Sequence, residues 1–234
     1  MDVVVDNYQF IGIGFAATVL LFLISGIGAL LLGTLLVAMR VGPIAVMRRA
    51  AATYVTLVRN TPLLLILVFF SLAAPKIGIN FQFVKIVIST GWGDIRMTNA
   101  FAGATVGLIL YTASFVCESL RSGVNAVPVG QAEAARAIGL PFGGVLSNVV
   151  LPQALRAALP PLASTLIALL KNTTVAASVL VLESAYALKQ ILDKTPGTVE
   201  KLWPIGVFIL VFVILVELLS FASGRLERRW RVAR

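Results

Sequence analysis

Long stretches without any charged residue constrain this chain more than any other feature. The run from Asn7 to Met39 contains no Asp, Glu, Lys or Arg, and neither does the run from Met97 to Cys117. A helix needs about 20 consecutive apolar residues to cross a bilayer, so both runs are long enough. With 59% hydrophobic and only 12% charged residues, the chain has more apolar surface than a soluble domain buries. The sequence therefore predicts an all-α, polytopic membrane protein.

Five spans are expected within one transmembrane domain that covers residues 1–234. The expected spans are 13–39, 52–74, 98–120, 157–175 and 203–224, with a cytoplasmic loop at 124–156. The limits of the second and fourth spans are the least defined. Arg59 and Pro62 come just before the apolar part of the second span, and Lys171 ends the short charge-free part of the fourth.

The distribution of basic residues predicts the orientation of the spans. One side of the membrane receives Arg40, Arg48, Arg49, Arg59, Arg121, Arg136, Arg156, Arg225, Arg228, Arg229, Arg231 and Arg234. The other side receives Lys76, Lys85, Arg96, Lys171, Lys189, Lys194 and Lys201, offset by Asp2, Asp6, Asp94, Glu183, Asp193 and Glu200. Loops rich in Lys and Arg stay in the cytoplasm. We therefore expect an outside N-terminus and a cytoplasmic C-terminus.

Several classes of function are disfavoured by what the chain lacks. It has no histidine and one cysteine, Cys117, which argues against histidine bases, zinc sites and internal disulfides. No phosphate-binding loop of the form G-x-x-x-x-G-K-[ST] is present, so any ATP would be bound by another chain. The net charge of +9 lies at the ends of apolar runs, which favours membrane flanks over nucleic acid. No metal or cofactor is expected in this chain.

A short polar helix is predicted between the third and fourth spans, in the stretch GQAEAARAIGLP from Gly130 to Pro141. Pro and Gly flank it on both sides, and it is too short to cross a bilayer. Ala134, Ala135 and Ile138 would lie on one flank, where small side chains let another surface approach closely. It could dock on a soluble partner, or it could only link two spans.

The residues around this helix carry a resemblance to a known family. Glu133-Ala134-Ala135, three residues, Gly139, nine residues and then Val149-x-Leu151-Pro152 resemble the EAA loop of ABC importer permeases, with Val in place of Ile. Further stretches resemble the polar amino-acid branch, in which many members carry Trp at the position of Ala132. These stretches are RNTPLL (59–64), ESLRSG (118–123), VPVGQAEAA (127–135), LPQALRAALPPL (151–162) and KNTT (171–174). ILYTASFVCESLRSG (109–123) looks most like glutamate permease subunits.

The resemblance implies one transmembrane subunit of a type I ABC importer, with a MetI-like fold, in a bacterial cell membrane. Two such subunits would form the pore, as a heterodimer rather than a homodimer. A separate ATPase dimer would bind ATP and Mg, and an extracytoplasmic binding protein would deliver a polar amino acid. Glutamate is the first expectation, with glutamine, aspartate and basic amino acids still open. The residues that would couple the chain to the ATPase are Glu133, Ala134, Ala135, Gly139, Leu151 and Pro152.

Three further groups of residues have both a functional and a plain interpretation. Arg59, Asn60 and Thr61, together with Lys171, Asn172 and Thr173, could line the substrate path, because broken helices do so in transporters. Alternatively, Arg59 is an inner membrane anchor and Lys171 extends to the outer surface. Glu118 and Arg121, three residues apart, could form a local ion pair or tie the third span to a neighbour.

Two other classes of function compete with the permease hypothesis. A secondary transporter or channel that works alone would move small polar solutes, but five spans leave no inverted pair within one chain. A membrane-embedded enzyme would need a nucleophile with its base or a metal cluster, and no such set is recognisable. We therefore expect a pore-forming subunit without catalytic residues.

Overall fold

The structure is a computed structural model that describes residues 2–81 and 87–230, so Lys85, Arg231 and Arg234 lie outside the described residues. Four helical segments in it are long and apolar enough to cross a membrane, at 8–41, 99–125, 143–179 and 202–229. A bent pair of helices, 45–59 and 63–77, makes up to five. The predicted all-α, polytopic fold is confirmed, and the limits of the spans in a bilayer stay a prediction.

Helices account for nearly every element of the chain. In order they are α1 (Asp2–Asp6), α2 (Tyr8–Val41), α3 (Ala45–Arg59), α4 (Leu63–Val68), the π-turn η1 (Phe69–Ala73), the 3-10 turn η2 (Ala74–Ile77), α5 (Asn99–Asn125), α6 (Val129–Ala137), α7 (Phe142–Val145), the π-turn η3 (Leu146–Val150), α8 (Leu151–Asn172), the 3-10 turn η4 (Thr173–Val179), α9 (Ser184–Lys194) and α10 (Leu202–Trp230). Strands β1 (Val87–Thr90) and β2 (Gly93–Arg96) precede α5.

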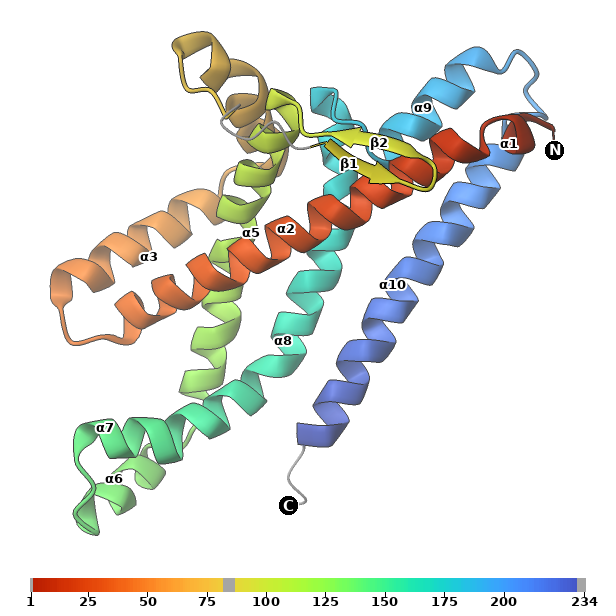
Figure 1. Cartoon of the computed structure of the whole chain (residues 1–234). Coiled ribbons are helices and arrows are strands. Elements are labelled where there is room, and N and C mark those ends of the chain that lie inside the picture. Colours follow the sequence, from red (N-terminus) through yellow and green to blue (C-terminus); the bar gives the residue numbers. More distant parts are fainter. Residues whose placement is uncertain (1, 82–86, 231–234) are drawn as a thin grey trace.

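Helix α5 forms the centre of the bundle, with α2 and α8 as its main neighbours (Figure 1). Its small residues allow this close packing. A Cβ placed on Gly123 would collide with the carbonyl oxygen of Ala154 in α8, and one on Gly103 would collide with the carbonyl of Phe70 in η1. Close backbone approach of this kind is the usual way in which helices associate within a membrane.

The second expected span is broken into two helices. The segment with α3 and the segment with α4 to η2 meet at an angle of 101°. Pro62 lies at this break with ψ of 133°, because proline lacks the N–H of a helix interior and keeps its preceding residue out of the helical region. The break therefore places Arg59, Asn60 and Thr61 at a helix end rather than inside a continuous span.

An antiparallel β-hairpin closes one end of the bundle and was not foreseen from the sequence. Its register pairs Val87 with Arg96 and Thr90 with Gly93. At the turn, Gly93 has φ of +142°, in the region that favours glycine. The ring of Trp92 lies against Gly12 of α2, where a Cβ would come within 2.5 Å of it.

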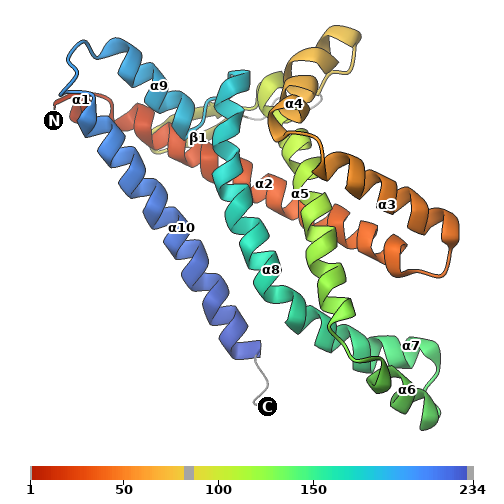
Figure 2. The same ribbon diagram turned by 180° about the vertical axis from the view of Figure 1, so that it is seen from behind.

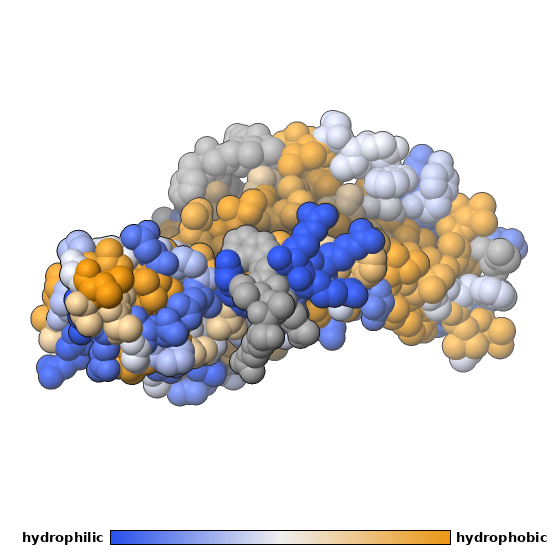
Figure 3. Space-filling model, turned by 90° about the horizontal axis from the view of Figure 1, so that it is seen from below, coloured by the Kyte–Doolittle hydropathy of each residue, from blue (hydrophilic) through white to orange (hydrophobic). Residues whose placement is uncertain are grey.

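The two ends of the molecule carry different elements. The N-terminus, the hairpin and α9 lie at one end, whereas α6, α7 and the C-terminal end of α10 lie at the other (Figures 1 and 2). Seen from the α6 end, hydrophilic side chains gather there and at the end of α10, while hydrophobic side chains cover much of the sides (Figure 3). This arrangement is that of a protein whose sides contact lipid.

Candidate functional site

Helix α6 is a short helix with defined stops at both ends. It starts after Pro128, which has an extended conformation. It ends at Gly139, whose φ of +88° is left-handed. The Gly139 N–H donates to the Arg136 carbonyl over 2.9 Å, and the Leu140 N–H donates to the Ala135 carbonyl over 3.2 Å. These two bonds form a Schellman motif, which uses glycine to satisfy the last carbonyls of a helix.

One face of α6 packs on the chain and the other is free. Ala135 is buried, and α6 contacts η3. Glu133, Ala134 and Gly139 are exposed, and Ile138 is 80% exposed. The free face therefore combines small residues, one carboxylate and one large apolar side chain, which suits contact with another protein.

The segments on either side of α6 are joined firmly to each other. Leu151 and Pro152 form the first turn of α8, where proline is well tolerated. Two residues further on, Ala154 meets Gly123 near the end of α5. A displacement of α6 is therefore expected to reach both α5 and α8.

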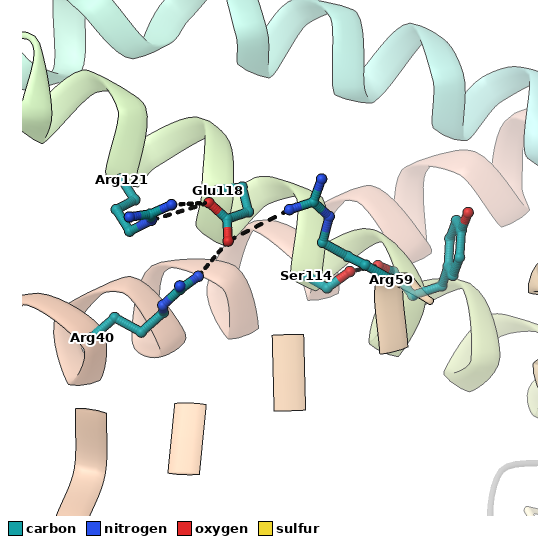
Figure 4. A network of polar contacts seen from close by, with 6 residues as sticks. Arg40, Arg59, Ser114, Glu118 and Arg121 are labelled. Atoms are coloured by element: carbon teal, nitrogen blue, oxygen red, sulfur yellow. Dashed lines mark hydrogen bonds and ion pairs between the residues drawn. The ribbon is translucent and has the colours of Figure 1, made fainter. Parts of the chain in front are cut away.

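Three arginines converge on Glu118 in α5 (Figure 4). Arg40 from the end of α2 places Nη1 2.5 Å from Oε1. Arg121 donates from Nε over 3.0 Å and from Nη2 over 2.8 Å to Oε2. Arg59, the last residue of α3, has Nη1 3.5 Å from Oε1. The pair expected between Glu118 and Arg121 is thus part of a cluster that joins α2, α3 and α5.

The cluster has an excess of positive charge. One carboxylate faces three guanidinium groups, and the side chains of Arg59 and Arg121 are 43% and 40% exposed, against 16% for Arg40. Sequence reasoning missed the contribution of Arg40, because it lies 78 residues from Glu118. The only signal in the sequence was the position of Arg40 directly after the long charge-free run, with no acidic residue near it in the sequence.

A cavity with several polar groups in a largely apolar lining lies between α5 and α8, next to this cluster. It has a volume of about 230 Å³ and is lined by Tyr111, Thr112, Phe115, Ser164, Thr165, Ala168, Leu169 and Asn172. The guanidinium carbon of Arg59 lies 5.2 Å from the centre of the Phe115 ring, on which the cation can rest. The structure therefore brings Arg59 and Asn172, expected on the substrate path, near one cavity.

The other residues expected on the path lie elsewhere. Lys171 lines a different groove, of about 470 Å³, which is shared with α9 and α10. Thr173 is buried and donates to the Leu170 carbonyl. Asn60 is exposed, and Thr61 donates to the Leu57 carbonyl. Successive residues of a helix point about 100° apart, so Lys171 and Asn172 face different sides of α8. Their roles in transport stay predictions.

Glu183 is a second carboxylate that sequence reasoning did not single out. It is fully buried between η4 and α9, outside the candidate spans. It caps α9 by accepting from the N–H groups of Ala185 and Tyr186, each over 2.9 Å. No base contacts it among the described residues, and burial raises its pKa to about 7.

Comparison with known proteins adds independent findings. Residues 29–232 match the family described as binding-protein-dependent transport system inner membrane component. The glutamate transport system permease protein GluC of Corynebacterium glutamicum is 39% identical over 93% of this chain and 92% of its own length. The probable glutamine ABC transporter permease protein GlnP of Bacillus subtilis is 31% identical, over 96% of this chain and 95% of its own.

Solved structures share the fold. A chain from the crystal structure of an amino acid ABC transporter with histidines has a TM-score of 0.80, with 23% identity over 97% of this chain and 96% of that one. A chain of the inward-facing MetNI methionine ABC transporter has a TM-score of 0.65, with 21% identity over 99% of this chain and 98% of that one.

Proposed function

This chain belongs to the family of binding-protein-dependent transport system inner membrane components, and from that premise we propose that it is the pore-forming subunit of a glutamate importer. The chain is a multi-pass membrane protein that resembles amino-acid ABC permeases along nearly its whole length. The proposal assigns half of the pore to this chain. The observation that carries it is the free face of α6, at the end of the two helices that line the cavity.

The proposed role of α6 is to transmit the closure of a separate ATPase dimer. Glu133, Ala134 and Gly139 would contact the ATPase, with Ala135 holding α6 against η3. Leu151 and Pro152 begin α8, so motion of α6 would tilt α8 and, through the Gly123 contact, α5. ATP and Mg would be bound by the ATPase alone, and this chain would contribute no catalytic group.

The proposed path for the amino acid follows the cavity between α5 and α8. Its hydroxyl and amide groups can replace part of the water around a polar solute. Glutamate is proposed from the 39% identity to GluC and from the surplus arginine charge near the cavity. Asn172 lines this cavity, whereas Lys171 and Thr173 are its sequence neighbours and do not line it.

The remaining partners follow from the proposed orientation. With α6 and the C-terminus in the cytoplasm, the N-terminus and the hairpin would face outward, where a binding protein would deliver the amino acid. A second, related permease would complete the pore, as a heterodimer. The excess of arginine at the α6 end supports this orientation.

Reconstitution tests the proposal. Proteoliposomes would contain this chain, its partner permease and the ATPase, with the binding protein added outside and ATP inside. We expect ATP-dependent uptake of labelled glutamate. Replacing Gly139 with Asp would remove the left-handed stop of α6 and is expected to abolish uptake with membrane insertion intact. Gly130→Asp is the matched control, because nothing lies within 4 Å of its Cβ position. Uptake that needs neither ATP nor the ATPase would instead indicate a transporter that works alone.

A further inference from the structure

Arg59 is the most loosely held of the three arginines around Glu118. Arg40 and Arg121 lie 2.5 Å and 2.8 Å from separate oxygens of the carboxylate. Arg59 lies 3.5 Å from an oxygen that Arg40 already occupies, and its side chain is 43% exposed. Since one negative charge is shared among three cations, the charge of Arg59 is the least compensated.

The position of Arg59 puts this charge next to a residue that lines the cavity between α5 and α8. Its guanidinium carbon lies 5.2 Å from the centre of the Phe115 ring, and Phe115 also lines the cavity, together with Tyr111, Thr165 and Asn172. The described lining combines hydroxyl and amide groups with aromatic and aliphatic side chains and has no charged side chain. A carboxylate in the cavity would thus have the cation of Arg59 beside the Phe115 ring.

The helix break places Arg59 at a helix end, with a partly exposed side chain. It is the last residue of α3, and the chain turns by 101° immediately after it. A side chain at a helix end has fewer neighbours than one inside a packed span. The Phe115 ring can support the guanidinium over a range of positions, because attraction to an aromatic face is only weakly directional.

We propose that Arg59 exchanges Glu118 for the side-chain carboxylate of an acidic amino acid in the cavity, and that it thereby sets a preference for anionic over neutral substrates. The inference rests on the proposed function. The exchange leaves Glu118 paired with Arg40 and Arg121, so no carboxylate loses its compensation. A neutral amide of the same size would gain nothing comparable from Arg59, since hydrogen bonds to charged groups are the stronger ones.

The test measures equilibrium binding of labelled glutamate and glutamine to the assembled complex in lipid nanodiscs, without the binding protein. Arg59→Gln is expected to weaken glutamate binding by at least about tenfold and to change glutamine binding by less than about twofold. Arg59→Lys keeps the charge and is expected to retain most of the preference. Arg121→Gln is the matched control, since it removes a similarly exposed partner of Glu118, and it should affect both amino acids equally.

Two results would overturn the inference. In the first, Arg59→Gln weakens the binding of glutamate and of glutamine to the same degree. In the second, the Arg59→Gln complex binds glutamate within about twofold of the affinity of the unmodified complex. If the Arg59→Gln complex fails to assemble, the Arg59→Lys complex is measured at raised salt instead. A preference for glutamate over glutamine that salt leaves unchanged would overturn the exchange, because a charge-based preference weakens with screening. Absence of any uptake by the unmodified complex would refute the proposed function itself, and this inference with it.

Discussion

Helices α5 and α10 are both long enough to cross a membrane, yet their surroundings differ completely. The most apolar window of α5 has a mean hydropathy of 1.8 and is 61% buried, whereas that of α10 has 2.8 and is only 6% buried. The more apolar helix is therefore the less buried one. Hydropathy measures compatibility with lipid, while packing inside the protein depends on small residues and on paired polar groups.

Their acidic residues show the same contrast. Glu118 in α5 is surrounded by three arginines. Glu217 in α10 lines the groove that also contains Lys171, and it makes no ion pair or hydrogen bond within the described part of the chain. The acidic residue of α5 thus has its partners within the same chain. The side of α10 is left open to contact lipid or another subunit.

The largest expected effect is on the packing of α5. Gly123→Leu would force a side chain into the backbone of α8 and is expected to cost about 3 to 5 kcal/mol, which is enough to prevent stable folding. Gly206→Leu in α10 adds the same atoms in open space and should be nearly neutral. Size-exclusion profiles and melting temperatures of the purified proteins would compare them. Equal losses in both variants would contradict the contrast between the helices.

A pH-dependent effect is expected at Glu183, which lies between η4 and α9. Burial raises its pKa to about 7 from an ordinary value of 4.5, so the folded protein binds this proton more tightly than the unfolded chain. The stabilisation is complete below pH 4.5 and is lost as the pH rises through 7, by about 3 kcal/mol in total. Glu183→Gln should flatten this profile. Hydrogen exchange in α9 at pH 5 and pH 8 would show it, and identical profiles for both proteins would disprove it.

Neutralising Glu118 in α5 and Glu217 in α10 should change the stability of the protein by different amounts. Glu118→Gln leaves three arginines facing one another and is expected to destabilise the protein by about 2 kcal/mol, below the range for fully buried pairs because the cluster is partly exposed. Glu217→Gln removes an unpaired charge from an apolar helix and should be neutral or slightly stabilising. Thermal unfolding in one lipid mixture measures both. A larger loss from Glu217→Gln would show that α10 depends on its charge more than α5 does.

The smallest expected effect concerns the C-terminal end of α10. Arg225 lies 4.5 Å from the centre of the Phe221 ring on the same helix. Both side chains are exposed, so Arg225→Gln should change the free energy of unfolding by no more than about 0.5 kcal/mol. Denaturant titration would set this limit. A loss near that of Glu118→Gln would mean that α10 is anchored through this residue.

The sequence predicted the fold class and the helix with the Gly139 stop, because charge-free runs and glycine stops are local features. It did not predict that Arg40 and Arg59 would meet Glu118, since those contacts depend on how three helices pack. The hairpin was also missed, because its short strands lie in a mixed segment without clear alternation. The different directions of Lys171 and Asn172 could have been foreseen from helical geometry alone.

The break at residues 60–62 also indicates which side of the helix bundle faces the lipid. Interrupted backbone leaves donors and acceptors that hydrocarbon cannot satisfy, so such a segment is excluded from direct contact with lipid tails. The side of the bundle that carries the break is therefore expected to face water or a neighbouring subunit, while the bare side of α10 faces lipid. A membrane-impermeant thiol reagent should label Asn60→Cys but not Ile214→Cys. Labelling only at position 214 would reverse this rotational assignment.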